Sequence, residues 1–168
     1  EVRAGKGVVD LVELDVYYLK EALPLIEDLT SRVHVWEDFE AIYQGARDAG
    51  SFNGKVYFIP HRLSWQALIY NALVLGKPPS TWEELLAVAR KHPSRIGIKA
   101  AQYEGLTCDL LPFIWQAGGN PLNLTDSGTV SAFEFLQKLG PSLNPASARY
   151  KESSILEAQE KQEILIHM

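Results

Sequence analysis

The absences in this 168-residue sequence exclude several classes of protein. A single cysteine, Cys108, excludes an intramolecular disulfide and any cysteine cluster for zinc or iron–sulfur within the sequence. No apolar run approaches the roughly 20 residues that a membrane-spanning helix needs. The net charge is −5 and the Lys and Arg residues are scattered. This charge argues against nucleic-acid binding, because a phosphate backbone is bound by a basic face.

Common catalytic and cofactor motifs are also missing. The chain has no Gly-x-Gly-x-x-Gly dinucleotide loop, no Gly-x-x-x-x-Gly-Lys-Ser/Thr phosphate loop, no His-Glu-x-x-His zinc motif and no Gly-x-Ser-x-Gly nucleophile elbow. The four histidines are far apart in the sequence, which disfavours a metal site built from them. We therefore expect no catalytic residue, no metal and no cofactor.

What is present indicates a globular α/β protein. Hydrophobic residues make up 46% of the sequence, an ordinary share for a folded domain. Residue patterns predict strands over 7–15, 55–59, 66–71, 96–98 and 163–168. They predict helices over 16–23, 36–46, 81–92, 107–116, 129–139 and 153–162. This alternation of strands and helices favours an α/β architecture with a mostly parallel sheet.

Aromatic and polar residues gather where the predicted strands end. Ligands of open α/β sheets bind beyond the carboxyl ends of the strands. Aromatic rings there stack on apolar ligand faces, while neighbouring polar groups satisfy hydroxyls. The alternative is that Tyr17, Trp65 and Tyr103 are ordinary core or rim aromatics.

Several short motifs, in a consistent order and spacing, point to a family. They are Ala4–Val12 (AGKGVVDLV), Gly54–Pro60 (GKVYFIP), Leu68–Asn71 (LIYN), Pro79–Leu85 (PSTWEEL) and Trp115–Gly119 (WQAGG). Together they resemble the extracellular solute-binding proteins of bacterial ABC importers, in the carbohydrate-binding branch that includes maltose-binding protein. The first motif departs from the family pattern, because valine stands at position 9 where proline is usual.

The resemblance implies a periplasmic-binding-protein-like fold with two α/β lobes joined by a hinge. Residues 1–59 would form part of the first lobe, 60–71 the hinge or crossing segment, and 72–168 part of the second lobe. We expect a fragment with both lobes incomplete, because family members have further chain on either side. The implied function is to capture a small solute, a sugar or oligosaccharide, and deliver it to the permease subunits of an ABC importer. The implied location is periplasmic or extracellular, at the cell envelope.

The resemblance also implies which residues contact solute. They lie after the first strand, in the crossing segment and before the helix over 107–116. In chain order these candidates are Asp15, Tyr17, Tyr18, His61, Arg62, Ser64, Trp65, Tyr103 and Glu104. Trp36 is a further candidate, whereas Tyr70 and Trp82 are predicted to pack in the core.

Alternatives remain open at this point. Arg62 beside His61 would also suit an anionic solute, such as a uronate or a phosphorylated sugar, because guanidinium binds carboxylate and phosphate bidentately. Asp15 and Glu104 would be the two carboxylates of a glycoside hydrolase if folding brought them within reach. A third hypothesis is an interaction module without a small ligand, whose aromatic residues form a protein-binding face.

Overall fold

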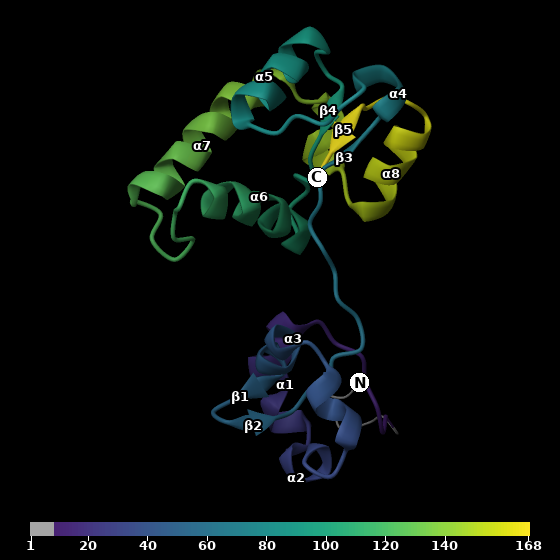
Figure 1. The fold of residues 1–168 in the computed structure, drawn as a ribbon, viewed down its shortest axis with the longest axis vertical. Coiled ribbons are helices and arrows are strands. Elements are labelled where there is room, and N and C mark those ends of the chain that lie inside the picture. The colour runs from purple at the N-terminus through teal and green to yellow at the C-terminus, as the bar shows by residue number, and fades with distance from the viewer. Residues whose placement is uncertain (1–8) are drawn as a thin grey trace. The chain divides into compact units, whose positions relative to one another are not determined.

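The computed structural model describes residues 9–168 and divides into two compact units (Figure 1). The first unit extends to Ser64, and the second runs from Trp65 to Met168. The lobe boundaries predicted from the sequence, with a crossing segment over 60–71, stay a prediction. Among residues 9–168, no helix is long and apolar enough to cross a bilayer.

The first unit consists of short helical segments and one hairpin. The helical segments are η2 (Val16–Tyr18), α1 (Leu19–Ala22), η3 (Leu23–Leu25), α2 (Thr30–Val33), η4 (Glu37–Ala41) and α3 (Gln44–Ala49). Strands β1 (Ser51–Phe52) and β2 (Lys55–Val56) pair antiparallel. The connecting residues Asn53 and Gly54 both have positive φ, at 50° and 75°. Asn-Gly is the preferred sequence for such a two-residue hairpin turn, because both residues tolerate this conformation.

Two sequence predictions in the first unit need correction. The strand predicted over 7–15 is wrong for the part described, since 9–15 form no strand and are exposed; residues 7 and 8 lie outside the described residues. An apolar run of this kind forms a strand only where another strand pairs with it. The helix predicted over 36–46 is two segments, η4 and α3, because the backbone is extended at Ile42 and not helical at Tyr43. The helix predicted over 16–23 is confirmed as the helical run η2, α1 and η3.

A three-stranded sheet is at the centre of the second unit. Its strands are β3 (Ile69–Tyr70), β4 (Ile96–Gly97) and β5 (Ile166–His167), in the order β3-β5-β4. Strand β5 runs antiparallel to β3 and parallel to β4. The predicted mostly parallel sheet is therefore wrong, because β5 enters between two strands and opposes one of them. Strands β2 to β5 are also shorter than predicted, and β1 was not predicted.

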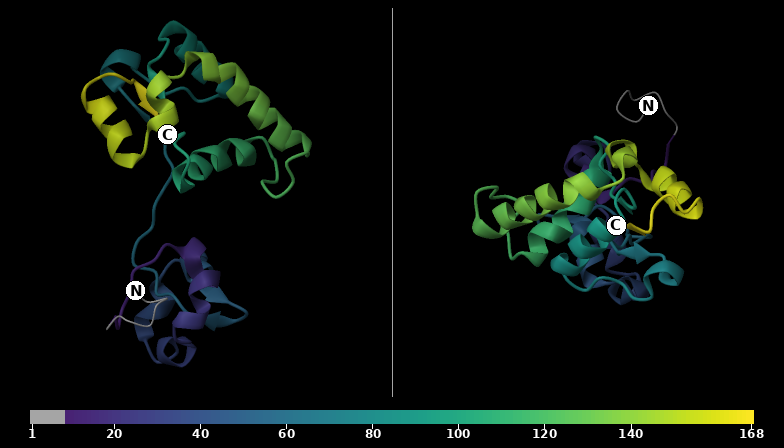
Figure 2. Two further views of the ribbon diagram at one scale, coloured as in Figure 1. Left: turned by 180° about the vertical axis from the view of Figure 1, so that it is seen from behind. Right: turned by 90° about the horizontal axis from the view of Figure 1, so that it is seen from above.

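Helices cover this sheet. They are α4 (Ala72–Leu75), α5 (Trp82–Lys91), α6 (Glu104–Gln116), α7 (Ser127–Leu139) and α8 (Glu152–Glu160), with the 3-10 segments η5 (Gly140–Ser142) and η6 (Pro145–Arg149). Helices α6 and α7 pack against each other (Figure 2). The four long helices were predicted, although α6 begins three residues earlier than expected.

Side chains cap the N-termini of the long helices α5 and α7. The Thr81 hydroxyl accepts a hydrogen bond from the Glu84 amide at 3.2 Å, and the Glu84 carboxylate accepts one from the Ser80 amide at 2.7 Å. The Asp126 carboxylate accepts bonds from the Gly128 and Thr129 amides. These contacts satisfy amides that have no partner within the helix.

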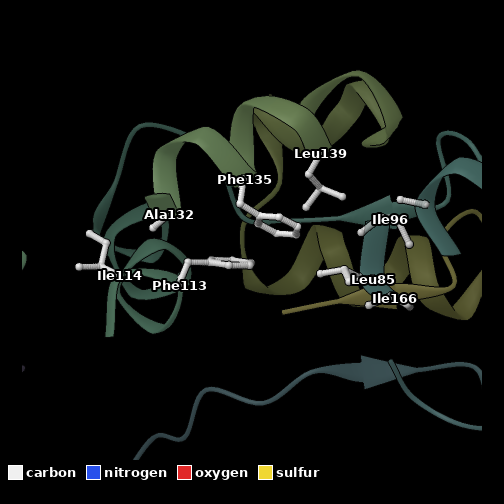
Figure 3. Close-up of a cluster of buried hydrophobic side chains, with 9 residues drawn as sticks. Leu85, Ile96, Phe113, Ile114, Ala132, Phe135, Leu139 and Ile166 are labelled. Carbon is white, nitrogen blue, oxygen red and sulfur yellow. The ribbon is translucent and has the colours of Figure 1, made fainter. Parts of the chain in front are cut away.

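The core of the second unit lies between the sheet and helices α5, α6 and α7 (Figure 3). Its buried members are Leu85, Ala89, Ile96, Phe113, Ile114, Ala132, Phe135, Leu139 and Ile166. Trp82 stacks on Phe135 with ring centroids 4.6 Å apart, and Tyr70 packs against the same cluster. The predicted packing role of Trp82 and Tyr70 is confirmed.

Candidate functional site

The carboxylate of Glu13, in the first unit, contacts two of the predicted site residues. Oε1 of Glu13 lies 3.1 Å from Nε2 of His61 and 2.6 Å from Nη2 of Arg62. All three side chains are more than half exposed, so solvent weakens these ion pairs. Sequence reasoning missed Glu13. Its signal was a lone acid between the apolar residues Val12 and Leu14.

Two neighbouring tyrosines form an exposed aromatic pair. The rings of Tyr17 and Tyr18 have centroids 4.3 Å apart and are tilted by 39°. The side chain of Tyr17 is 54% exposed and that of Tyr18 is 42% exposed. Asp15, also exposed, lies two residues before Tyr17, and its side chain makes no capping hydrogen bond to η2. Exposed rings of this kind can stack on the apolar face of a ligand.

Trp36 is tied more closely to the core than the other candidates of the first unit. Its ring centroid lies 5.8 Å from that of Phe39, which is 6% exposed. The geometry fits an aromatic packing contact. Trp36 remains 39% exposed, so part of the indole still faces solvent.

Ser64 and Trp65 stand on either side of the boundary between the units. Ser64 is the last residue of the first unit, and Trp65 is the first of the second. Both are exposed, and Trp65 is 81% exposed. A tryptophan this exposed contributes little to its own unit's core, so its apolar surface is available to a ligand.

Tyr103 and Glu104 mark the start of α6 in the second unit. The Tyr103 hydroxyl donates a 2.8 Å hydrogen bond to Oε1 of Glu152, and Lys151 Nζ lies 5.4 Å from its ring centroid. Burial, followed by the bond to Glu152, raises the pKa of Tyr103 well above its usual range. Tyr103 is therefore held as a neutral hydroxyl. Glu104 is exposed in the first turn of α6, where a helix dipole favours an acid.

The second unit also contains a cavity of about 230 Å³. Its walls include Gln66, Trp82, Asp109, Phe113 and Gln116. None of the ten predicted site residues, all in the described part of the chain, lines this cavity. Trp82 Nε1 donates a 2.9 Å hydrogen bond to Oε1 of Gln116 at its edge.

A buried charge network borders this cavity. Asp109 is 3% exposed and Lys99 is 8% exposed. Lys99 Nζ lies 2.6 Å from Asp109 Oδ1, and the Lys99 amide donates to Oδ2 at 2.7 Å. Gln66 Nε2 donates to Oδ1 at 2.9 Å. The sequence signal for Asp109 was the lone charged residue within the predicted helix over 107–116.

The predicted residues are thus brought together only in part. His61 and Arg62 share Glu13, and Tyr17 contacts Tyr18. Of the alternative hydrolase pair, Asp15 belongs to the first unit and Glu104 to the second. Among residues 9–168, no group of three or more His, Cys, Asp or Glu side chains is arranged to hold a metal ion.

Two solved structures share the fold of this chain. Maltose-bound MalE3 of T. maritima is 25% identical and aligns with a TM-score of 0.83 over 98% of this chain and 47% of its own. A solute-binding protein of an ABC transporter from Thermotoga lettingae, bound with alpha-D-tagatose, is 20% identical with a TM-score of 0.83. That match covers 99% of this chain and 48% of the other. These matches confirm the predicted α/β fold of the two-lobed solute-binding type.

Sequence comparison gives the same result. A "Probable ABC transporter-binding protein" of Deinococcus radiodurans is 27% identical over 88% of this chain and 40% of its own length. The chain therefore spans less than half the length of these relatives. The family model of the bacterial extracellular solute-binding proteins matches residues 1–161, in agreement with the predicted periplasmic or extracellular location. Since this match extends over nearly the whole sequence, the chain belongs to the family of bacterial extracellular solute-binding proteins.

Proposed function

We propose that the protein carrying this chain is the substrate-binding receptor of an ABC importer and that its solute is a sugar or oligosaccharide. The observation that carries the proposal is the structural match to maltose-bound MalE3 over 98% of the chain. The relative in Deinococcus radiodurans, described as a probable ABC transporter-binding protein, supports the transport role. Receptors of this kind bind and deliver solute without chemical conversion, so we propose no enzymatic activity.

The proposed mechanism is capture followed by closure. Solute binds one lobe, and residues 60–71 act as the hinge that lets the other lobe close over it. Solute shifts the open–closed equilibrium by its preference for the closed state. The closed form then docks on the permease subunits. The exposed aromatic residues Tyr17, Tyr18 and Trp65 would stack on the sugar, while polar candidates bind its hydroxyls.

The contacts of Glu13 bear on the charge of the solute. Arg62 and His61 both lie against the same Glu13 oxygen, so the positive charge of Arg62 already has a counter-ion. An anionic solute would have to compete with Glu13 for the guanidinium of Arg62. A neutral sugar needs only hydrogen bonds from these groups, and we therefore favour a neutral solute over the uronate or phosphorylated sugar considered above.

The test is sugar-dependent stabilisation of the full-length protein. A ligand at 100 times its dissociation constant stabilises the folded state by about 2.7 kcal/mol. We expect a thermal shift that rises with concentration for at least one neutral sugar or oligosaccharide in a panel. Absence of a shift across the panel would favour an interaction module. Hydrolysis of chromogenic glycosides that is lost in Glu104→Gln would favour the hydrolase.

A further inference from the structure

We propose that Gln66 is a positioning residue that anchors the crossing segment to the second unit, so that bending of the connection ends at Trp65. Gln66 is the second residue of the second unit, after Trp65. Its side-chain amide donates to Asp109, which lies 43 residues further along the chain on α6. The connection is thus fastened at its second residue within the second unit.

The acceptor of this hydrogen bond is firmly held. Asp109 accepts two bonds from Lys99, one from the ammonium group and one from the backbone amide. Lys99 Nζ also donates to the carbonyl of Met168 at 2.7 Å. Both side chains are buried, so water screens these interactions little. Hydrogen bonds to charged groups are stronger than neutral ones, which favours Gln66 staying attached.

The chain before Gln66 has few constraints of its own. Residues 57–68 form no helix or strand, and 61–65 are all exposed. Its start is held by backbone hydrogen bonds from Tyr57 and Phe58 to the Gly50 carbonyl. Further on, His61 and Arg62 make exposed contacts with Glu13 in the first unit. After Gln66, Leu68 packs against the core and β3 begins at Ile69. Gln66 therefore lies between the exposed residues 61–65 and the part of the chain that packs in the second unit.

Asp109 has a counter-ion without Gln66. Because Lys99 contacts both carboxylate oxygens, a Gln66→Leu variant keeps the buried ion pair and should still fold. The variant removes only the link between the crossing segment and α6. The anchoring role of Gln66 can therefore be tested without a large change in the stability of the second unit.

The experiment measures local motion on either side of Gln66 in the full-length protein without solute. A nitroxide label is attached in a Cys108→Ser background to Leu63→Cys or to Ala67→Cys, both at exposed positions. We expect the label at 67 to be more immobile than the label at 63. Adding Gln66→Leu should bring the mobility at 67 close to that at 63. The proposal would be overturned by equal mobility of the two labels while Gln66 is present. It would also be overturned if Gln66→Leu had no effect on the label at 67.

A second variant, Gln66→Glu, adds a pH dependence that a simple loss of packing would not produce. In Gln66→Glu, the new carboxylate faces Asp109 and Lys99, with His167 as the neighbouring titratable group on β5. When ionised it repels Asp109, and when protonated it can donate as Gln66 does. We expect the label at 67 to become less mobile as the pH falls. Mobility that does not change with pH would count against the anchor.

Gln116→Leu is the matched control. It removes a glutamine that lines the same cavity and bonds Trp82, but it lies on α6 rather than on the crossing segment. We expect it to leave the mobility at 67 unchanged, and an effect equal to that of Gln66→Leu would also overturn the proposal. The measurements need no ligand, so their outcome is independent of whether the proposed sugar-binding function holds.

Discussion

Glu13 and Arg62 are joined through a single carboxylate oxygen, with 2.6 Å between Oε1 and Nη2, and the same oxygen lies 3.1 Å from Nε2 of His61. The three side chains come from two stretches of the first unit that contain no helix or strand. The contact therefore fastens the start of the crossing segment to the stretch before η2. It also balances the positive charge of Arg62.

Removing this counter-ion should change which solutes bind. In Glu13→Gln, Arg62 loses its carboxylate partner and becomes available to an anionic sugar. Exposed ion pairs contribute up to about 1 kcal/mol, so we expect the affinity for glucuronate relative to glucose to rise about two- to fivefold. Isothermal titration calorimetry at low ionic strength measures both affinities.

The control for this prediction is Glu27→Gln. Glu27 also forms an exposed ion pair with an arginine, at 3.1 Å from Arg32 Nη2, but no predicted solute residue takes part. It should leave the affinity ratio unchanged. An unaltered ratio in Glu13→Gln would show that Glu13 does not set the preference for charge.

Trp65→Ala should weaken sugar binding without destabilising the fold. The indole is 81% exposed, and substitution of such a surface residue usually changes stability by no more than about 0.5 kcal/mol. Loss of one aromatic stacking contact of about 0.5–1.5 kcal/mol should raise the dissociation constant roughly two- to tenfold. Trp65→Phe should retain part of the affinity. Leu73→Ala, at a position 99% exposed, serves as the control, and equal affinities of Trp65→Ala and the parent protein would remove Trp65 from the site.

Leu139→Ala should strongly destabilise the second unit. Leu139 is fully buried in the cluster between the sheet and α7. A buried Leu→Ala change leaves a cavity and costs about 2.7–5 kcal/mol. Urea unfolding followed by circular dichroism measures the loss. Leu122→Ala, at a position 94% exposed, should stay close to the parent protein, and similar values for both variants would contradict the assigned core.

The second unit should lose stability as the pH falls below about 6.5, the ordinary histidine value. Burial lowers the pKa of His167, with Lys99 acting in the same direction and Asp109 and a backbone bond opposing it. The unfolded chain therefore takes up a proton at a pH where the folded chain does not. The stabilisation is complete above the unfolded pKa and declines as the pH approaches the lower folded one.

Thermal unfolding between pH 7 and pH 5 tests this linkage. His167→Gln should flatten the decline of the melting temperature, because it removes the titrating group. His34→Gln changes an exposed histidine of the first unit and should leave the decline intact. A His167→Gln variant with the same pH dependence as the parent protein would assign the effect to other groups.

The long helices could be predicted because their signals are local. At α5, Thr81 and Glu84 have the spacing of a capped helix start, and the Thr81 hydroxyl and the Glu84 carboxylate both accept hydrogen bonds from backbone amides there. The helix over 129–139 was predicted from its apolar stripe, although Asp126 begins it earlier by capping Gly128 and Thr129. Such patterns lie within a few residues of one another, so one sequence suffices to find them.

The strands and the network around Asp109 could not be predicted in the same way. The apolar run before Asp15 has the composition of a strand, but the described part of the structure offers it no pairing partner. Similarly, nothing local to Gln66 indicates that its amide meets a carboxylate 43 residues away. Pairing and burial of this kind depend on the folded chain as a whole.

Strand β5 occupies the middle of its sheet although it is the last of the three strands in the sequence. Neither β3 nor β4 can complete its hydrogen bonding until residues 166 and 167 have been synthesised. During translation both strands must wait with one edge unpaired, and closing the sheet requires contacts distant in sequence, which form slowly. The second unit thus stays without its central strand until this part of the chain has emerged.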